Sequence, residues 1–114
     1  MIKEESSLSS EEKVLIGKVD KVIQKVNELK EDRKEFEQLV SKLQEERNEL
    51  LLKKASEKYR YLSEKLLKCI LLLDEIKCTE STPNARAKRK ATIEDIQKVL
   101  KELDLLEDSF KNKL

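Results

Sequence analysis

Turn-forming residues are almost absent from this chain. Its 114 residues include one glycine, Gly17, and one proline, Pro83. An all-β fold needs many tight turns, and these are built largely from glycine, proline and other small turn formers. The chain is instead rich in leucine, lysine and glutamate, which lose little rotamer freedom in a helix. The sequence therefore predicts a few long helices and argues against a sheet.

Charge decides whether those helices fold or remain disordered. Charged residues make up 43% of the chain, which is typical of disordered segments, but the formal net charge is only +1. The apolar residues recur at helical spacing, so they can form buried stripes. We therefore expect a folded domain. Near-neutrality also argues against a dedicated nucleic-acid binder, which normally carries a strong basic excess.

The apolar runs and the two cysteines indicate where in the cell the protein is expected. The longest candidate apolar run, residues 69–73, is far shorter than the roughly 18 residues that a membrane span needs. Cys69 and Cys78 are nine positions apart, which in a continuous helix separates their Cα atoms by roughly 13 Å, too far for a disulfide. We expect no membrane association and a cytoplasmic location, with the nucleus as an alternative.

The first helix is predicted over residues 10–40, after a disordered tail at residues 1–8. Ser9 and Glu12 have the spacing of a capping box. One apolar stripe with coiled-coil character follows, interrupted at Arg33 and Arg47. The residues of the stripe are Leu15, Val19, Val22, Val26, Leu29, Phe36, Val40, Leu43 and Leu50.

Two further helices are predicted over residues 45–78 and 83–112. Ser41 and Gln44 match a second capping box, so we expect the first turn near residues 40–45. Thr82 is expected to cap the third helix, with Pro83 at its first position, where the missing N–H costs nothing. Short loops make neighbouring helices antiparallel, so the predicted fold is all-α: an antiparallel three-helix bundle of long amphipathic helices spanning residues 9–114.

An unbroken first helix is the alternative. No proline or second glycine forces a break between Leu15 and Ile76. A continuous helix of that length would measure roughly 95 Å and would be stable only in an intermolecular coiled coil. The alternative function is therefore that of a structural protein that forms a coiled-coil oligomer through residues 15–60. The alternative also leaves the oligomeric state open between a monomer and a helix-exchanged dimer.

The inventory of reactive residues argues against an enzyme. The chain has no histidine, two cysteines and one glycine. It therefore lacks the usual catalytic triad, a complete set of zinc ligands, and the glycine-rich loops that cradle phosphates. We expect no catalytic residues, no metal site and no cofactor.

A basic run opens the third predicted helix, and here the chain resembles a known family. The run RAKRK is followed by an amphipathic segment that contains Gln97. Together RAKRKATIEDIQKVL and the preceding YLSEKLLKCILLLDEI resemble the last two helices of the BAG-domain family of co-chaperones, most strongly from Tyr61 to Phe110. The resemblance implies a three-helix bundle that binds the ATPase domain of the 70 kDa heat-shock chaperone and promotes ADP release.

The resemblance also implies a contact set. Carried over position by position, the family's contacts fall on Glu64, Asp74, Arg89 and Gln97, with Glu75 as an alternative to Asp74. Arg86 and Lys90 belong to the same basic cluster and are included among the candidate partner-binding residues.

Two simpler roles are also possible for these charged residues. Charges on such helices commonly form i,i+4 surface pairs worth a few tenths of a kcal/mol. The basic run could instead serve nuclear import or bind nucleic acid, although Glu94 and Asp95 follow it at once.

Overall fold

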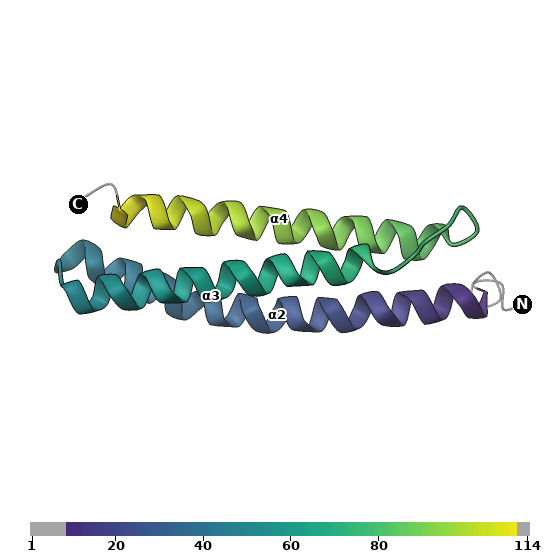
Figure 1. Cartoon of the computed structure of the whole chain (residues 1–114), viewed down its shortest axis with the longest axis horizontal. Helices are drawn as coiled ribbons and strands as arrows, with labels where there is room; N and C mark the ends of the chain where they lie inside the picture. Colours follow the sequence, from purple (N-terminus) through teal and green to yellow (C-terminus); the bar gives the residue numbers. More distant parts are fainter. Residues whose placement is uncertain (1–8, 112–114) are drawn as a thin grey trace, which may run out of the picture.

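Three helices make up most of the part of the chain that the computed structural model describes, residues 9–111. They are α2 (Ser10–Glu45), α3 (Glu49–Asp74) and α4 (Pro83–Lys111). Successive helices run antiparallel along a rod of 62 × 24 × 16 Å, and each helix packs against both others (Figure 1). The expected all-α, antiparallel three-helix bundle is confirmed. The expected tail at residues 1–8 lies outside the described residues.

The core lies along the axis of the rod, where the apolar stripes of the helices meet. Phe36 of α2 is fully buried at one end, with its ring 6.2 Å from that of Phe110 in an edge-to-face arrangement. Leucine, isoleucine and valine fill most of the remainder, since the chain has few aromatic residues. The largest of the fully buried apolar side chains are Val19, Val26, Phe36, Leu62, Leu66, Leu73, Ile96, Leu103 and Phe110.

The first turn lies further along the chain than the expected residues 40–45. α2 continues through Ser41 and ends at Glu45, because Val40 and Leu43 are buried core residues that a turn there would remove. Asn48, not Ser41, caps α3: its side-chain oxygen accepts hydrogen bonds from the backbone N–H groups of Leu50 and Leu51, at 2.8 and 3.3 Å. α3 ends at Asp74, four residues earlier than the predicted boundary at 78.

The start of α4 is capped from a distant part of the chain. Pro83 is the first helical residue, as expected, but the Thr82 hydroxyl bonds to the backbone of Thr79 within the loop. The free N–H groups of Asn84 and Ala85 donate instead to the carboxylate of Glu12 in α2, at 2.6 and 3.1 Å. Glu12 is only 2% exposed. The backbone N–H of Glu12 donates to the Ser9 hydroxyl, which is one of the two bonds of the expected capping box. The Glu12 carboxylate, which would make the other bond, accepts the N–H groups of α4 instead.

The two arginines that interrupt the first stripe hold α4 against its neighbours. Arg33 forms an ion pair with Glu102 of α4 at 2.6 Å. Arg47, in the turn after α2, donates to the backbone carbonyl of Phe110 at 2.9 Å, near the C-terminal end of α4. A positive side chain complements the helix dipole at that end, as the Glu12 carboxylate does at the other.

We expect Glu12→Ala to lower the free energy of unfolding by about 1–2 kcal/mol, because two N–H groups of α4 would lose their acceptor in a buried position. Glu11→Ala is the matched control: it removes an exposed carboxylate from the same first turn of α2. Urea unfolding followed by circular dichroism measures both. Equal losses in the two variants would show that the Glu12 cap contributes nothing of its own.

We expect light scattering to give the mass of one chain, 13.4 kDa. The apolar stripe from Leu15 to Leu43 is already covered by α3 and α4, so this stripe leaves no apolar seam for an intermolecular coiled coil. A helix-exchanged dimer or a coiled-coil oligomer would give a multiple of this mass and would favour the structural alternative.

Candidate partner-binding surface

Five of the six candidate partner-binding side chains are exposed, on the helices that the sequence indicated. Glu64 lies in the middle of α3, and Asp74 is its last residue. On α4, Arg86, Lys90 and Gln97 are exposed and share one side of the helix, because positions 86, 90 and 97 differ by about 40° or less around the axis. We call Glu64, Asp74, Arg86, Arg89, Lys90 and Gln97 the mixed-charge face.

Arg89 differs from the other members because it also makes a contact within the chain. It is half-buried, and its guanidinium donates to the backbone carbonyl of Ile76 at 2.6 Å, just after the end of α3. A guanidinium has five N–H donors, so this bond leaves donors free for a partner. Arg89 therefore joins the start of α4 to the end of α3 and holds the two parts of the face in one arrangement.

Asp74 and Glu75 point to different sides of α3. Successive residues at this end of the helix are turned by about 100°. Glu75 lines a groove between α2 and α3, while Asp74 does not. Glu75 is therefore the acidic residue on the side toward α2, and Asp74 is turned away from it.

Two exposed leucines on α3 belong to this surface and were not among the candidates. Leu67 is 51% exposed and Leu71 is 61% exposed. They follow Glu64 by three and seven positions, so they lie on one stripe of the helix between Glu64 and Asp74. The signal was present in the sequence: the run LLKCILLLD holds more apolar residues than a single buried stripe requires.

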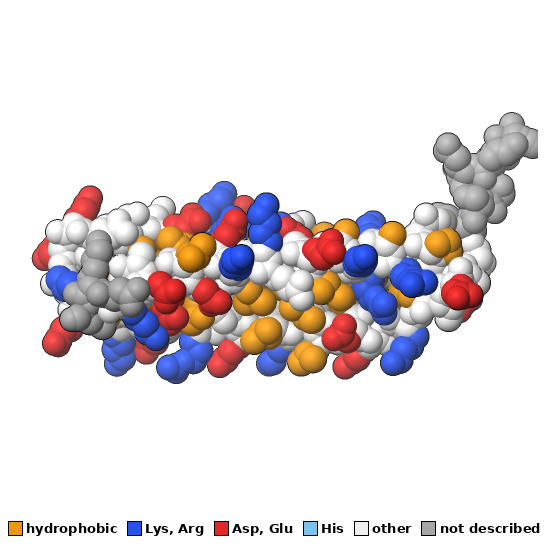
Figure 2. Space-filling view, turned by 90° about the horizontal axis from the view of Figure 1, so that it is seen from above, with side chains coloured by type: hydrophobic (Ala, Val, Ile, Leu, Met, Phe, Trp, Pro, Cys, Tyr) orange, Lys and Arg blue, Asp and Glu red, His pale blue; other side chains and the backbone are white. Residues whose placement is uncertain are grey.

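The mixed-charge face thus has an apolar centre with charged residues around it. Seen from the α4 side, apolar side chains reach the surface in the middle of the rod and are bordered by both acidic and basic side chains (Figure 2). A buried apolar centre with a polar rim is the usual anatomy of a protein–protein interface. Lys88, from the same basic run, does not join the face, since it pairs with Asp20 of α2 at 2.6 Å.

A second polar contact ties α3 to α4 further along the rod. The Tyr59 hydroxyl donates to the Asp104 carboxylate at 2.5 Å. This hydrogen bond, together with partial burial, raises the pKa of Tyr59 to about 12. With the Arg89 contact, it gives the α3–α4 pair a polar connection at two separated points.

No group of three or more histidine, cysteine or acidic side chains in the range of residues 9–111 is arranged to hold a metal ion. Nor is any helix within it sufficiently long and apolar to cross a bilayer.

A comparison with protein-family models matches residues 19–106 to the BAG domain. The match begins in α2, includes all of α3 and extends over most of α4. Searches of curated proteins and of solved structures found no match.

We expect Tyr59→Phe to reduce the loss of stability at alkaline pH. The pKa of Tyr59 is about 12 in the folded protein against 10.0 for an unperturbed tyrosine, so its contribution is complete below pH 10 and is lost as the pH rises from 10 to 12. Urea unfolding at pH 9, 10.5 and 12 measures this, with Tyr61→Phe as the control. An unchanged pH dependence in Tyr59→Phe would contradict the role of the Asp104 hydrogen bond.

Proposed function

Because the chain belongs to the BAG-domain family, we propose that it is a co-chaperone that binds the ATPase domain of the 70 kDa heat-shock chaperone and promotes ADP release. BAG domains bind this ATPase domain and act as nucleotide exchange factors. The observation that carries the proposal is the family match, which spans parts or all of α2, α3 and α4 rather than a short motif.

The mixed-charge face is the surface that we assign to the chaperone. It presents Glu64 and Asp74 from one helix beside Arg86, Arg89 and Lys90 from the next. A surface with both signs of charge suits a partner of complementary pattern, and arginine favours paired hydrogen bonds with a carboxylate. Leu67 and Leu71 would supply the apolar area that such an interface needs at its centre.

The proposed mechanism is mechanical. A protein shifts a conformational equilibrium of its partner only by binding one state more tightly than the other. If the mixed-charge face fits the ATPase domain with its nucleotide cleft open, binding weakens ADP affinity and speeds its release. By linkage, nucleotide must weaken the binding of this chain by the same factor.

The rigidity of the α3–α4 pair suits that mechanism. The contacts of Arg89 with Ile76 and of Tyr59 with Asp104 fix the two helices before any partner binds. A preformed surface loses less conformational freedom on binding, so more of the interaction energy is left to hold the open state. A co-chaperone of this kind would act where the chaperone does, in the cytoplasm or the nucleus.

We expect the wild-type chain to accelerate release of a fluorescent ADP analogue from the chaperone ATPase domain, and Glu64→Ala/Gln97→Ala to lower this acceleration by about tenfold or more. Neither side chain makes a hydrogen bond or ion pair within the described residues, so the variant should keep its fold. Stopped-flow fluorescence measures the release rate.

Gln24→Ala/Glu28→Ala is the matched control, since it removes the same two residue types from exposed positions of α2. Arg89→Ala is informative only beside a circular dichroism spectrum, because Arg89 also bonds to Ile76. Acceleration that persists in Glu64→Ala/Gln97→Ala would retain the function and overturn the assigned face. Absence of both acceleration and binding by the wild type would overturn the function.

A further inference from the structure

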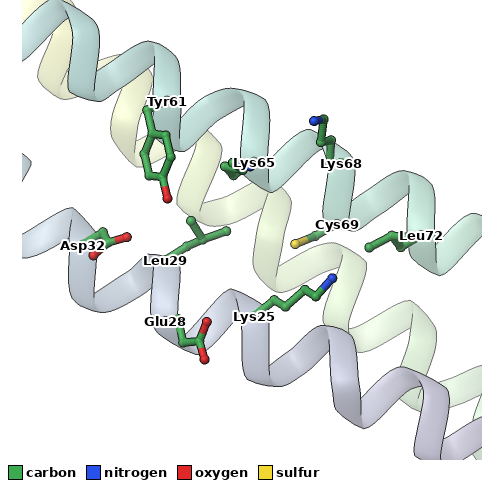
Figure 3. A pocket seen from close by; sticks show the side chains of 9 residues that line it. All are labelled: Lys25, Glu28, Leu29, Asp32, Tyr61, Lys65, Lys68, Cys69 and Leu72. Atoms are coloured by element: carbon green, nitrogen blue, oxygen red, sulfur yellow. The ribbon is translucent and has the colours of Figure 1, made fainter.

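A second surface lies between α2 and α3 and is separate from the mixed-charge face. It is a groove of about 320 Å³ that continues into a neighbouring hollow of about 340 Å³, and the two share Lys25 and Leu72. Lysine side chains border it from both helices, as seen from nearby in Figure 3. We call it the lysine groove, after its five lysines: Lys18, Lys21, Lys25, Lys65 and Lys68.

The floor of the lysine groove is apolar. Leu29 and Cys69 point between the two helices, and Leu72 and Tyr61 are 37% and 43% exposed beside them (Figure 3). Burial raises the pKa of the Cys69 thiol, while the nearby Lys25 ammonium acts in the opposite direction. The floor thus consists of two buried side chains, Leu29 and Cys69, and two partly exposed ones, Leu72 and Tyr61, and it adjoins positive charge.

The five lysines of the groove have no ion-pair partner among residues 9–111. Other lysines that reach a neighbouring helix do: Lys30 pairs with Asp95 at 2.7 Å and Lys88 with Asp20 at 2.6 Å between α2 and α4, and Lys58 pairs with Glu35 at 3.4 Å elsewhere between α2 and α3. Within this range, the lysines of the groove are therefore not neutralised by ion pairs, and Lys65 lies over the Tyr61 ring, 5.9 Å from its centroid.

Three acidic side chains also line the groove. Glu28 and Asp32 lie toward one end, with Tyr61, and Glu75 lies toward the other. A nucleic-acid backbone or a flat anionic membrane would meet these carboxylates and would make little use of an apolar floor. A short segment with apolar residues in its centre and carboxylates on its edges fits both features.

We propose that the lysine groove docks an acidic amphipathic helix of a second protein partner. The apolar stripe of that helix lies on Tyr61 and Leu72, above the buried Leu29 and Cys69, and its carboxylates pair with lysines on both rims. The mixed-charge face lies on the α3–α4 side and the groove on the α2–α3 side, so both surfaces are accessible at once. The inference does not depend on the chaperone function, because it rests on different residues.

The test uses a fluorescent synthetic peptide of about 18 residues, five helical turns, with leucines at helical spacing along one face and glutamates beside them. Fluorescence anisotropy measures its binding to the full chain. A scrambled peptide of the same composition destroys the stripe while keeping the charge. Vesicles containing phosphatidylserine and a single-stranded oligonucleotide test the other anionic partners.

We expect the patterned peptide to bind, to weaken with added salt, and to lose affinity about tenfold or more in Lys21→Glu/Lys25→Glu. The control Lys98→Glu/Lys101→Glu makes the same charge change at exposed positions of α4 and should bind as the wild type does. Lys21→Glu/Lys25→Glu should still accelerate ADP release if the chaperone function holds, so failure of one proposal is distinguishable from failure of the other.

Three outcomes would overturn the inference. Equal binding of the scrambled peptide would show attraction by charge alone, without docking on the apolar floor. Binding of the vesicles or the oligonucleotide without binding of the peptide would identify a different class of partner. No binding of the patterned peptide at high micromolar concentration would show that the groove does not dock such a helix.

Discussion

The position of α4 depends on opposite charges held at its two ends. The carboxylate of Glu12 accepts two N–H groups at the N-terminus of α4, and Arg47 donates to a carbonyl near its C-terminus. Both groups come from α2 or the turn that follows it, and both complement the helix dipole. Leucines and valines can slide past one another with small changes in buried area, but these bonds form in one register only. They therefore set where α4 lies along the rod, and with it where Arg86, Arg89 and Gln97 are presented.

The mixed-charge face and the lysine groove share α3 and differ in how they are built. The mixed-charge face carries acidic, basic and apolar side chains from α3 and α4, and Arg89 fixes it from within. The lysine groove carries cations above an apolar floor between α2 and α3, with no ion-pair partner for them in residues 9–111. A domain with two such surfaces can hold two proteins together. Both proposals describe binding and not catalysis. This agrees with a sequence that has no histidine and one glycine, and so lacks the residues of the usual catalytic and phosphate-binding motifs.

Local sequence patterns predicted the helices better than the contacts between them. The apolar stripes and Pro83 follow from periodicity and from backbone geometry, so the fold class could be predicted. Ser41 and Asn48 are both suitable residues for the N-cap of α3. Burial of Val40 and Leu43 within α2 decides for Asn48. The role of Glu12 could not be predicted, because its partners lie 72 and 73 residues away. Leu67 and Leu71 could have been found, because the segment around them holds more apolar residues than one buried stripe requires.

The arrangement of α3 has a consequence for which genetic changes the domain can accept. Glu64 and Lys65 are adjacent in sequence but serve different surfaces, and Leu71 and Leu72 are divided in the same way. One inserted or deleted residue turns everything beyond it by about 100°. Such a change within α3 would carry residues from one surface toward the other and would also displace the buried stripe. Related chains should therefore vary in the identity of residues along α3, while differences in length collect at residues 46–48 and 75–82.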